Sequence, residues 1–148
     1  MIRKATLKDL NQLTNLFDQY VVFYNKPSNH EKHKAYLKER IENNEATVFM
    51  AFDNKKPEKA IGFTLVYVTF SSLALNKILM LNDLFVDSTI RKKGTGEQLI
   101  LQTVKLSKEL GSNLIRLRTA KNNTIAQGLY HKMGFVRDKH LYTYDLTV

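Results

Sequence analysis

The sequence predicts a mixed α/β fold, in which helices cover a sheet that is mostly antiparallel and ends in a parallel crossover. Three apolar, β-branched segments follow one another in the middle of the chain, separated only by turn-forming residues, which is typical of an antiparallel meander. Segments with apolar residues at helical spacing precede and follow them. A loop with two glycines, Gly94 and Gly96, then joins a strand to a helix. The expected order of elements is β-α-α-β-β-β-α-β-α-β-β.

The first part of the chain is expected to form a short strand and two helices. Residues 2–6 form the strand, and the spacing of Thr6 and Asp9 resembles a capping box at the start of a helix. The apolar face of that helix consists of Leu10, Leu13, Phe17, Tyr20, Val21 and Tyr24. After a break at Pro27, Ser28 predicts the start of the second helix.

The middle of the chain is expected to form the meander. The three strands are expected at residues 47–52, 60–70 and 78–86, with turns at residues 53–57 and 71–75. Strands joined by such short turns pair as antiparallel neighbours.

The last part of the chain returns to alternating helices and strands. After the glycine loop, a helix carries the apolar stripe Leu99, Thr103, Leu106 and Leu110, and Gly111 is placed to end it. Residues 114–119 alternate Leu or Ile with Arg and are expected to lie parallel to the preceding strand, through a right-handed crossover. A short helix and two strands are then expected at residues 123–132, 135–136 and 141–146.

The composition limits the classes of protein that the chain can belong to. A length of 148 residues predicts one domain, residues 1–148. The net charge of +9 suits nucleic acid, a membrane surface or an anionic small ligand, but the charges are dispersed, which favours a solvated surface and disfavours a nucleic-acid partner. Cysteine is absent, which excludes disulfides and a thiol nucleophile. Without an apolar leader or a long apolar run, we expect a cytoplasmic protein with no membrane partner.

The glycine loop has the features of an anion-binding site. The first N–H groups of a helix have no partner within the helix, and the helix dipole favours negative charge there. Gly94 and Gly96 let a ligand approach the backbone closely. Three cations directly precede them, Arg91, Lys92 and Lys93. These observations predict a phosphorylated cofactor.

Three other phosphate-binding motifs do not fit this loop. No Walker A run, Gly-x-x-x-x-Gly-Lys-Ser/Thr, occurs in the chain. The dinucleotide-binding fingerprint requires a third small residue where Leu99 stands. No Asp-containing catalytic loop of the kinase type follows.

The motif Arg91-x-x-Gly94-x-Gly96, preceded by the strand that ends at Val86, resembles the coenzyme A loop of the GNAT (Gcn5-related) N-acetyltransferases. A second motif, Asn123-x-x-Ala126-x-x-x-Tyr130-x-x-x-Gly134-Phe135, resembles the downstream motif of the same family with its spacing intact. The opening residues 2–6 and Asp9 are also similar to the first strand and helix of the family. The resemblance covers nearly the whole chain.

This resemblance implies that acetyl-CoA is the cofactor and assigns residues to it. The backbone of Leu84, Phe85 and Val86 would pair with the pantetheine amides. The pyrophosphate would lie on the loop amides of Lys92, Lys93, Gly94, Thr95, Gly96 and Glu97, with the side chains of Arg91 and Lys93 beside it. Asn123 and Ala126 would line the other side of the cofactor, and no metal is expected.

The resemblance also implies catalytic roles. Since there is no cysteine, the acceptor amine would attack the thioester directly. The backbone N–H of Val86, or of Phe85 next to it, would polarise the thioester carbonyl. Tyr130 would be the general acid for the thiolate; a Tyr at this place could instead be a core aromatic that packs with Leu129, Met133 and Phe135.

The general base is less defined by the sequence. The polyamine-modifying branch of the family has a Leu-Glu-Asp strand, where this chain has Leu81–Asn82–Asp83, and Asn82 cannot accept a proton. Asp83 is the candidate, acting through water or by orienting the amine, and the alternative is a structural hydrogen-bond acceptor. Strand alternation predicts that Asn82 and Asp83 lie on opposite faces of the sheet.

We expect Tyr20, Tyr24 and Asn82 to line the binding site of the acceptor amine. The two tyrosines suit a cationic acceptor, because aromatic faces bind cations. Tyr142 and Tyr144 would share one face of an edge strand, where they could line the same cleft or lie in a dimer interface. His30 and His33 lack metal-type partners and are expected on the solvated surface.

The sequence therefore predicts an acetyl-CoA-dependent N-acetyltransferase that acts directly on a primary amine of a small molecule. Two alternatives stay open: a non-catalytic acyl-CoA-binding module of the same family, and a basic nucleic-acid-binding domain. The family often forms homodimers through its last strands. The sequence leaves the acceptor open among amino acids, polyamines, aminoglycosides, small metabolites and protein N-termini.

Overall fold

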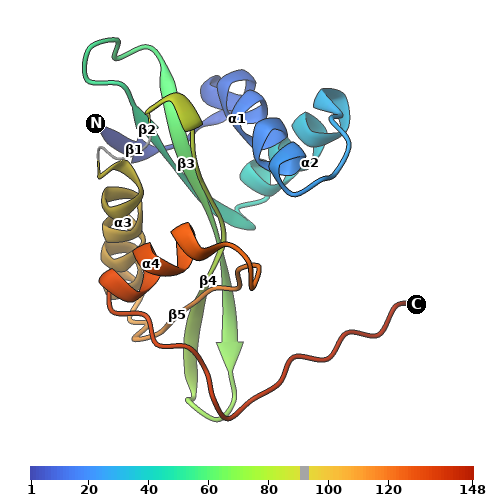
Figure 1. Cartoon of the computed structure of the whole chain (residues 1–148), viewed down its shortest axis with the longest axis vertical. Coiled ribbons are helices and arrows are strands. Elements are labelled where there is room, and N and C mark those ends of the chain that lie inside the picture. The colour runs from blue at the N-terminus through green and yellow to red at the C-terminus, as the bar shows by residue number, and fades with distance from the viewer. Residues whose placement is uncertain (91–93) are drawn as a thin grey trace. The chain divides into compact units, whose positions relative to one another are not determined.

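The computed structural model describes residues 1–90 and 94–148 (Figure 1). The chain divides into two compact units, Met1–Arg118 and Thr119–Val148, and each is described by itself. Within the described residues, no helix is both long enough and apolar enough to span a membrane.

The described residues of the first unit form a five-stranded sheet and three α-helices. Its elements are β1 (Ile2–Lys4), α1 (Leu10–Phe23), α2 (His30–Glu42), β2 (Ala46–Phe52), β3 (Ala60–Ser71), β4 (Asn76–Val86), α3 (Thr95–Glu109) and β5 (Ile115–Arg116). The strands lie in the order β1-β2-β3-β4-β5, and all neighbours are antiparallel except β4 and β5, which are parallel. The predicted meander and the parallel crossover are confirmed.

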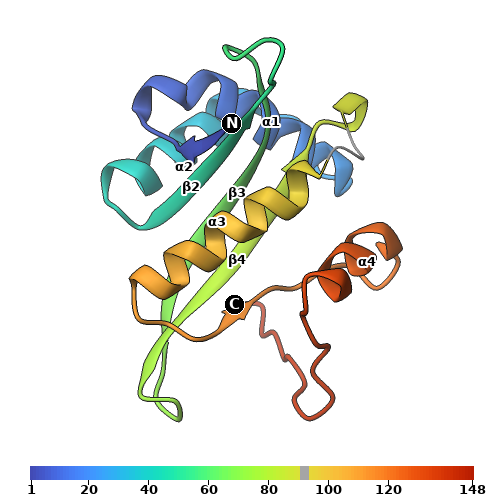
Figure 2. The same cartoon turned by 90° about the vertical axis from the view of Figure 1, so that its left-hand side faces the viewer.

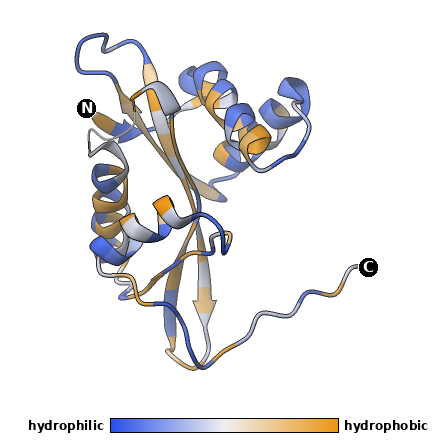
Figure 3. Ribbon diagram, in the orientation of Figure 1, coloured by the Kyte–Doolittle hydropathy of each residue, from blue (hydrophilic) through white to orange (hydrophobic). Residues whose placement is uncertain are grey.

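The helices of this unit cover both faces of the sheet (Figures 1 and 2). Helices α1 and α2 pack on one face, which we call the α1–α2 face, and α3 packs on the other. The core of the α1–α2 face includes Leu13, Leu37, Met50, Phe63 and Leu65, all of which are fully buried. In Figure 3 the strands are largely apolar, while the turn between β2 and β3 is hydrophilic.

The helix ends follow from local hydrogen bonding. The capping box of Thr6 and Asp9 is present, and it opens a 3-10 turn, Leu7–Asp9, that leads into α1. The predicted cap of α2 was wrong by one residue, because the Asn29 side chain accepts the N–H of Lys32. Ser28 instead donates its hydroxyl to the Asp18 carboxylate at 2.6 Å.

The second unit contains one helix, α4 (Thr124–Lys132), and a long extended tail (Figure 1). The prediction of strands at residues 135–136 and 141–146 was wrong: the described residues of the tail form no strand. A strand needs the main-chain groups of a neighbour, which alternation in the sequence cannot supply. Tyr142 and Tyr144, which were predicted to share one face of an edge strand, lie outside any strand of the described residues. Their exposed fractions are 89% and 88%.

The predicted mixed α/β class and the order of elements from β1 to α4 are confirmed. Strand β5 is shorter than the predicted strand at residues 114–119, since only Ile115 and Arg116 pair with β4.

Candidate active site

A bulge in β4 shapes the α1–α2 face of the sheet. Leu65 pairs with Asp83, but the next residue of β3, Val66, pairs with Leu81. Asn82 is therefore an extra residue without a partner on β3. Such a bulge bends its strand and changes the direction of the side chains around it.

The bulge brings Asn82 and Asp83 together. The Nδ2 atom of Asn82 donates to Oδ1 of Asp83 at 3.1 Å, so the prediction that strand alternation would separate these side chains was wrong. The physical reason is the extra residue, which interrupts the two-residue period of the strand. Asn82 is exposed, whereas Asp83 is only 6% exposed.

The Asp83 carboxyl is held in an environment that disfavours its charge. Burial raises the pKa of Asp83 above its usual range, and hydrogen bonds from Tyr20 and Asn82 oppose this increase only in part. A buried carboxyl whose pKa is raised is a stronger proton acceptor than an ordinary carboxylate.

Tyr20 of α1 donates a hydrogen bond to this carboxyl, and Tyr24 is the C-cap residue that follows α1. The Tyr20 ring contacts the rings of Tyr24, Phe63 and Phe85 at centroid distances of 4.9, 6.0 and 6.3 Å. The structure therefore brings Tyr20, Asn82 and Asp83 together, with Tyr24 packed edge-on against Tyr20.

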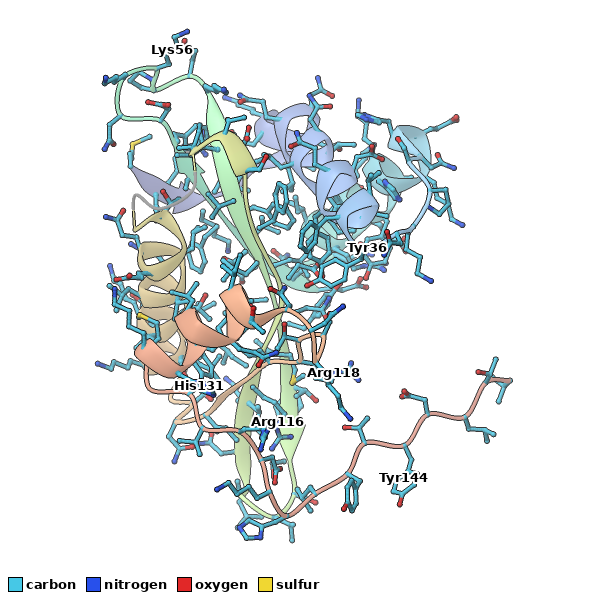
Figure 4. The ribbon with its side chains drawn as sticks, viewed as in Figure 1. Tyr36, Lys56, Arg116, Arg118, His131 and Tyr144 are labelled. Atoms are coloured by element: carbon cyan, nitrogen blue, oxygen red, sulfur yellow. The ribbon has the colours of Figure 1, made fainter. Side chains whose placement is uncertain are left out.

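Two further tyrosines, which the sequence analysis did not single out, belong to the same face. The hydroxyl oxygens of Tyr36 on α2 and Tyr67 on β3 are 2.5 Å apart, and Tyr36 is labelled in Figure 4. Burial, the Tyr36 hydroxyl and the charge of Asp83 together raise the pKa of Tyr67, so its hydroxyl stays protonated. No short motif links these residues; only the tertiary structure, in which α2 packs on β2 next to β3, brings them together.

A guanidinium near this pair is already neutralised. The Arg40 guanidinium lies 4.8 Å from the centre of the Tyr36 ring. It also forms ion pairs with Glu39, at 2.9 Å, and with Glu45. Arg40 therefore supports Tyr36 and adds no net positive charge to the face.

Strand β5 covers only a short part of the outer edge of β4. Among the described residues, β5 pairs with β4 only at Leu79 and Met80. The N–H of Asp87 donates to the carbonyl of Ile61 at 2.8 Å, which sets the hydrogen-bond alternation between β3 and β4. With this alternation, the main-chain N–H and C=O groups of Leu84 and Val86 point away from β3, and those of Phe85 point toward β3.

Two glycines allow the backbone geometry of this region. A Cβ atom on Gly62, which pairs with Val86, would lie 2.8 Å from the carbonyl oxygen of Phe85. Gly94 has φ +75° and precedes the first turn of α3, which contains Thr95, Gly96 and Glu97. A Cβ on Gly94 would meet nothing within 4 Å, so only its φ requires glycine. The predicted phosphate residues Arg91, Lys92 and Lys93 lie outside the described residues.

The second unit holds the residues of the downstream motif. The Asn123 side chain caps α4 by accepting the N–H of Ala126 at 3.2 Å. Tyr130 is half-buried on α4, and its ring lies edge-on against Phe135 with centroids 5.8 Å apart.

The histidines of α2 do not lie free on the surface. The Nδ1 atom of His33 is 2.8 Å, and the Nε2 atom of His30 is 3.2 Å, from the Asp18 carboxylate. Burial opposes the charge of Asp18, but Ser28, Asn29 and His33 together hold its pKa below the usual range. The expectation of a solvated His33 was wrong, because its side chain is only 15% exposed.

Comparison with known proteins agrees with this fold. The model of the acetyltransferase (GNAT) family matches residues 11–135. An uncharacterized N-acetyltransferase of Bacillus subtilis, YhfO, is 36% identical over 99% of this chain and 97% of its own length. The D-amino-acid N-acetyltransferase HPA3 of Saccharomyces cerevisiae is 34% identical over 63% of this chain and 57% of its own.

Solved structures share the arrangement as well. The crystal structure of a probable acetyltransferase has a TM-score of 0.93 and 29% identity, over 100% of this chain and 97% of that chain. An aminoglycoside N-acetyltransferase in complex with CoA has a TM-score of 0.83 and 21% identity, over 100% of this chain and 95% of that chain; at this identity the likeness concerns the fold alone.

The family match, the full-length relative and the fold agree with the two motifs read from the sequence. The chain belongs to the acetyltransferase (GNAT) family and is an N-acetyltransferase.

Proposed function

We propose that the protein transfers an acetyl group from acetyl-CoA directly to a primary amine of a small molecule. The supporting observation is the buried Asp83 carboxyl on the α1–α2 face, next to Tyr20 and on the part of β4 that lies beyond its pairing with β5. A primary amine is protonated at neutral pH and must lose a proton to become a nucleophile. Asp83 is the group on this face that can take it.

The backbone around Leu84 and Gly94 fits coenzyme A. The main-chain N–H and C=O of Leu84 point to the side of β4 where β5 no longer pairs with it. There they can form hydrogen bonds with the amides of an extended pantetheine chain. The start of α3, after Gly94, offers helix N–H groups for a pyrophosphate. On the basis of the sequence, we also assign Arg91, Lys92 and Lys93 to the pyrophosphate. Bound acetyl-CoA supplies the acetyl group as a thioester.

The residues of this chain then have three tasks. Asp83 accepts the proton of the acceptor's ammonium group. The N–H of Val86 donates toward the acyl oxygen, where negative charge develops. Tyr130 would give its hydroxyl proton to the departing sulfur, since a phenol and a thiol have ordinary pKa values close enough to exchange a proton at small cost. The second proton, which the nitrogen loses on becoming an amide, would return to the Tyr130 phenolate through water. Asn123 and Ala126 line the cofactor on its other side.

The extent of the matches supports treating residues 1–148 as one acetyltransferase domain, since YhfO aligns over 99% of the chain. A homodimer stays a prediction, which light scattering on the purified protein would test.

The experiment is an acceptor screen that follows free thiol. The chain has no cysteine, so a thiol reagent reports only coenzyme A. Purified protein and acetyl-CoA are incubated with amino acids, polyamines, aminoglycosides and simple alkylamines. We expect thiol release that saturates with at least one amine and an N-acetylated product by mass spectrometry. Saturable binding of acetyl-CoA without release for any amine would contradict direct transfer to a small amine and favour a non-catalytic acyl-CoA-binding module.

A further inference from the structure

Arg116 of β5, and Arg118 two residues beyond it, lie on the same side of the sheet as Asp83. In the register of the sheet, Tyr67 pairs with Met80, and Met80 pairs with Arg116, so the three residues form one row across β3, β4 and β5. Side chains in such a row point to the same face. Tyr67 packs against the core of α1 and α2, which places Arg116 on the α1–α2 face.

Arg118 continues this face toward the site. Exposure alternates along residues 115–118, with half-buried Ile115 and Leu117 between exposed Arg116 and Arg118. Both arginines are labelled in Figure 4, where they extend from the β5 segment. Because β4 and β5 run parallel from the pair of Met80 and Arg116, Arg118 follows in the direction in which β4 reaches Asn82 and Asp83. Neighbouring strands are about 4.8 Å apart.

The charges of the two guanidiniums are not compensated within the described part of the chain. No ion pair or hydrogen bond joins the side chain of Arg116 or Arg118 to any residue of the ranges 1–90 and 94–148. Arg40, by contrast, is held by Glu39 and Glu45. The buried carboxyl of Asp83 thus has, one strand away, two guanidiniums without an ion-pair partner in the described part of the chain.

We propose that Arg116 and Arg118 bind an anionic group of the acceptor, a carboxylate or a phosphate, while Asp83 faces its amine. This inference rests on the proposed function and names the class of acceptor: a small molecule with a primary amine and an anion a few bonds apart. Guanidinium groups bind such oxygens in pairs and with defined geometry.

The same charges disfavour other acceptors. A polyamine brings a second ammonium, which two guanidiniums would repel, and Asn82 offers it no carboxylate. A simple alkylamine satisfies Asp83 but leaves both guanidiniums without a ligand. Discrimination of this kind is large when a site is built to bind a polar group that the competitor lacks.

The test compares acceptors that differ only in the anion. Phenylalanine is compared with 2-phenylethylamine, and O-phosphoethanolamine with ethanolamine, in wild type, Arg118→Gln and Arg116→Gln. Lys56→Gln is the matched control, because it removes one positive charge from the exposed turn between β2 and β3 (Figure 4). We expect kcat/KM for the preferred anionic acceptor to exceed that of its uncharged partner by roughly tenfold or more. This ratio falls toward one in both arginine variants, but not in Lys56→Gln, and KM for acetyl-CoA is unchanged.

The two pairs distinguish the source of the anion, since only one of them shows the preference if the site is specific for carboxylate or for phosphate. Equal rates with and without the anion, or a preference that survives both arginine substitutions, would overturn the inference while the proposed function stands. If no amine releases thiol, the proposed function fails instead.

A second measurement does not depend on turnover. N-acetylphenylalanine and N-acetylphosphoethanolamine keep the anion and lack the ammonium, so they report on the arginines alone. With coenzyme A present, we expect one of them to bind wild type saturably in calorimetry, and roughly tenfold more weakly to Arg118→Gln. Absence of binding to wild type by both compounds would also overturn the inference.

Discussion

The Nδ2 atom of Asn82 lies 3.1 Å from Oδ1 of Asp83, although the two residues are consecutive in a β-strand. In a regular strand their side chains would point to opposite faces. The bulge in β4 removes that constraint and lets an amide donate to a carboxyl that is only 6% exposed. Asn82 cannot accept a proton itself, but its amide donates a hydrogen bond to Asp83, which can accept one.

Replacing the buried carboxyl should separate activity from stability. Burial raises the pKa of Asp83, so the carboxylate is disfavoured in the folded state. The contribution of this group to stability is therefore present at low pH and lost as the pH rises through its raised pKa. We expect Asp83→Asn to unfold at the same or a higher urea concentration than wild type at pH 8, with kcat lower by roughly 100-fold or more.

The pH profile gives the matching readout. In wild type, kcat should fall on the acid side as Asp83 becomes protonated, and this limb should be absent in Asp83→Asn. A variant with wild-type kcat at pH 8 would remove Asp83 from the mechanism.

The phenol of α4 should matter for turnover rather than for binding. Tyr130→Phe keeps the ring that packs against Phe135 at 5.8 Å and removes only the hydroxyl. We expect kcat to fall by roughly 100-fold, with the Kd of acetyl-CoA within about twofold of wild type in calorimetry. Equal turnover in the variant would leave Tyr130 as a packing residue.

Two glycines offer a matched pair of substitutions. In Gly62→Ala the new methyl group would lie 2.8 Å from the Phe85 carbonyl oxygen, so β3 and β4 must move apart. We expect a loss of about 1–3 kcal/mol in the free energy of unfolding, together with weaker binding of acetyl-CoA at the β4 edge. In Gly128→Ala nothing lies within 4 Å of the new atom, and the residue is inside α4. This control should gain about 0.5–1 kcal/mol. Urea denaturation of both variants measures the two effects, and a neutral Gly62→Ala would show that the close approach of β3 and β4 is not needed.

The ion pair at the N-terminus should give a defined acid transition. Hydrogen bonds from the Arg3 guanidinium, at 2.6 and 2.8 Å, are the largest cause of the low Asp9 pKa, about 2. Because this pKa lies below the ordinary value of 3.8, the stabilisation is present above pH 4 and is lost as the pH falls toward 2.

Asp9→Asn should therefore lower the free energy of unfolding by about 1–2 kcal/mol at pH 7 and by much less at pH 2.5. Glu109→Gln is the control, since its partner Lys105 is 4.0 Å away on the exposed face of α3, and such pairs contribute little. A loss for Asp9→Asn that does not change with pH would point to packing rather than to the carboxylate.

Much of the fold could be predicted because its signals are local. The capping box of Thr6 and Asp9 and the αL conformation of Gly94 and Gly111 depend on a few neighbouring residues. The meander follows from three β-rich segments with short turns. The last two strands could not be predicted in this way, because the segment around Tyr142 and Tyr144 has strand-like residues but no main-chain partner in the described structure.

In the candidate site, too, some features follow from local sequence and others from contacts between distant segments. By itself, the sequence determined the family and the residues that belong to its two motifs, since glycine spacing and a strand followed by a helix are contiguous features. Only the tertiary structure decided what surrounds Asp83. One extra residue in β4 turned Asn82 toward it, the packing of α1 and α2 brought in Tyr20, Tyr36 and Tyr67, and the register of β5 placed Arg116 on the same face. The physical reason is that bulges, strand register and helix packing result from contacts between segments far apart in the chain, whose geometry no local pattern contains.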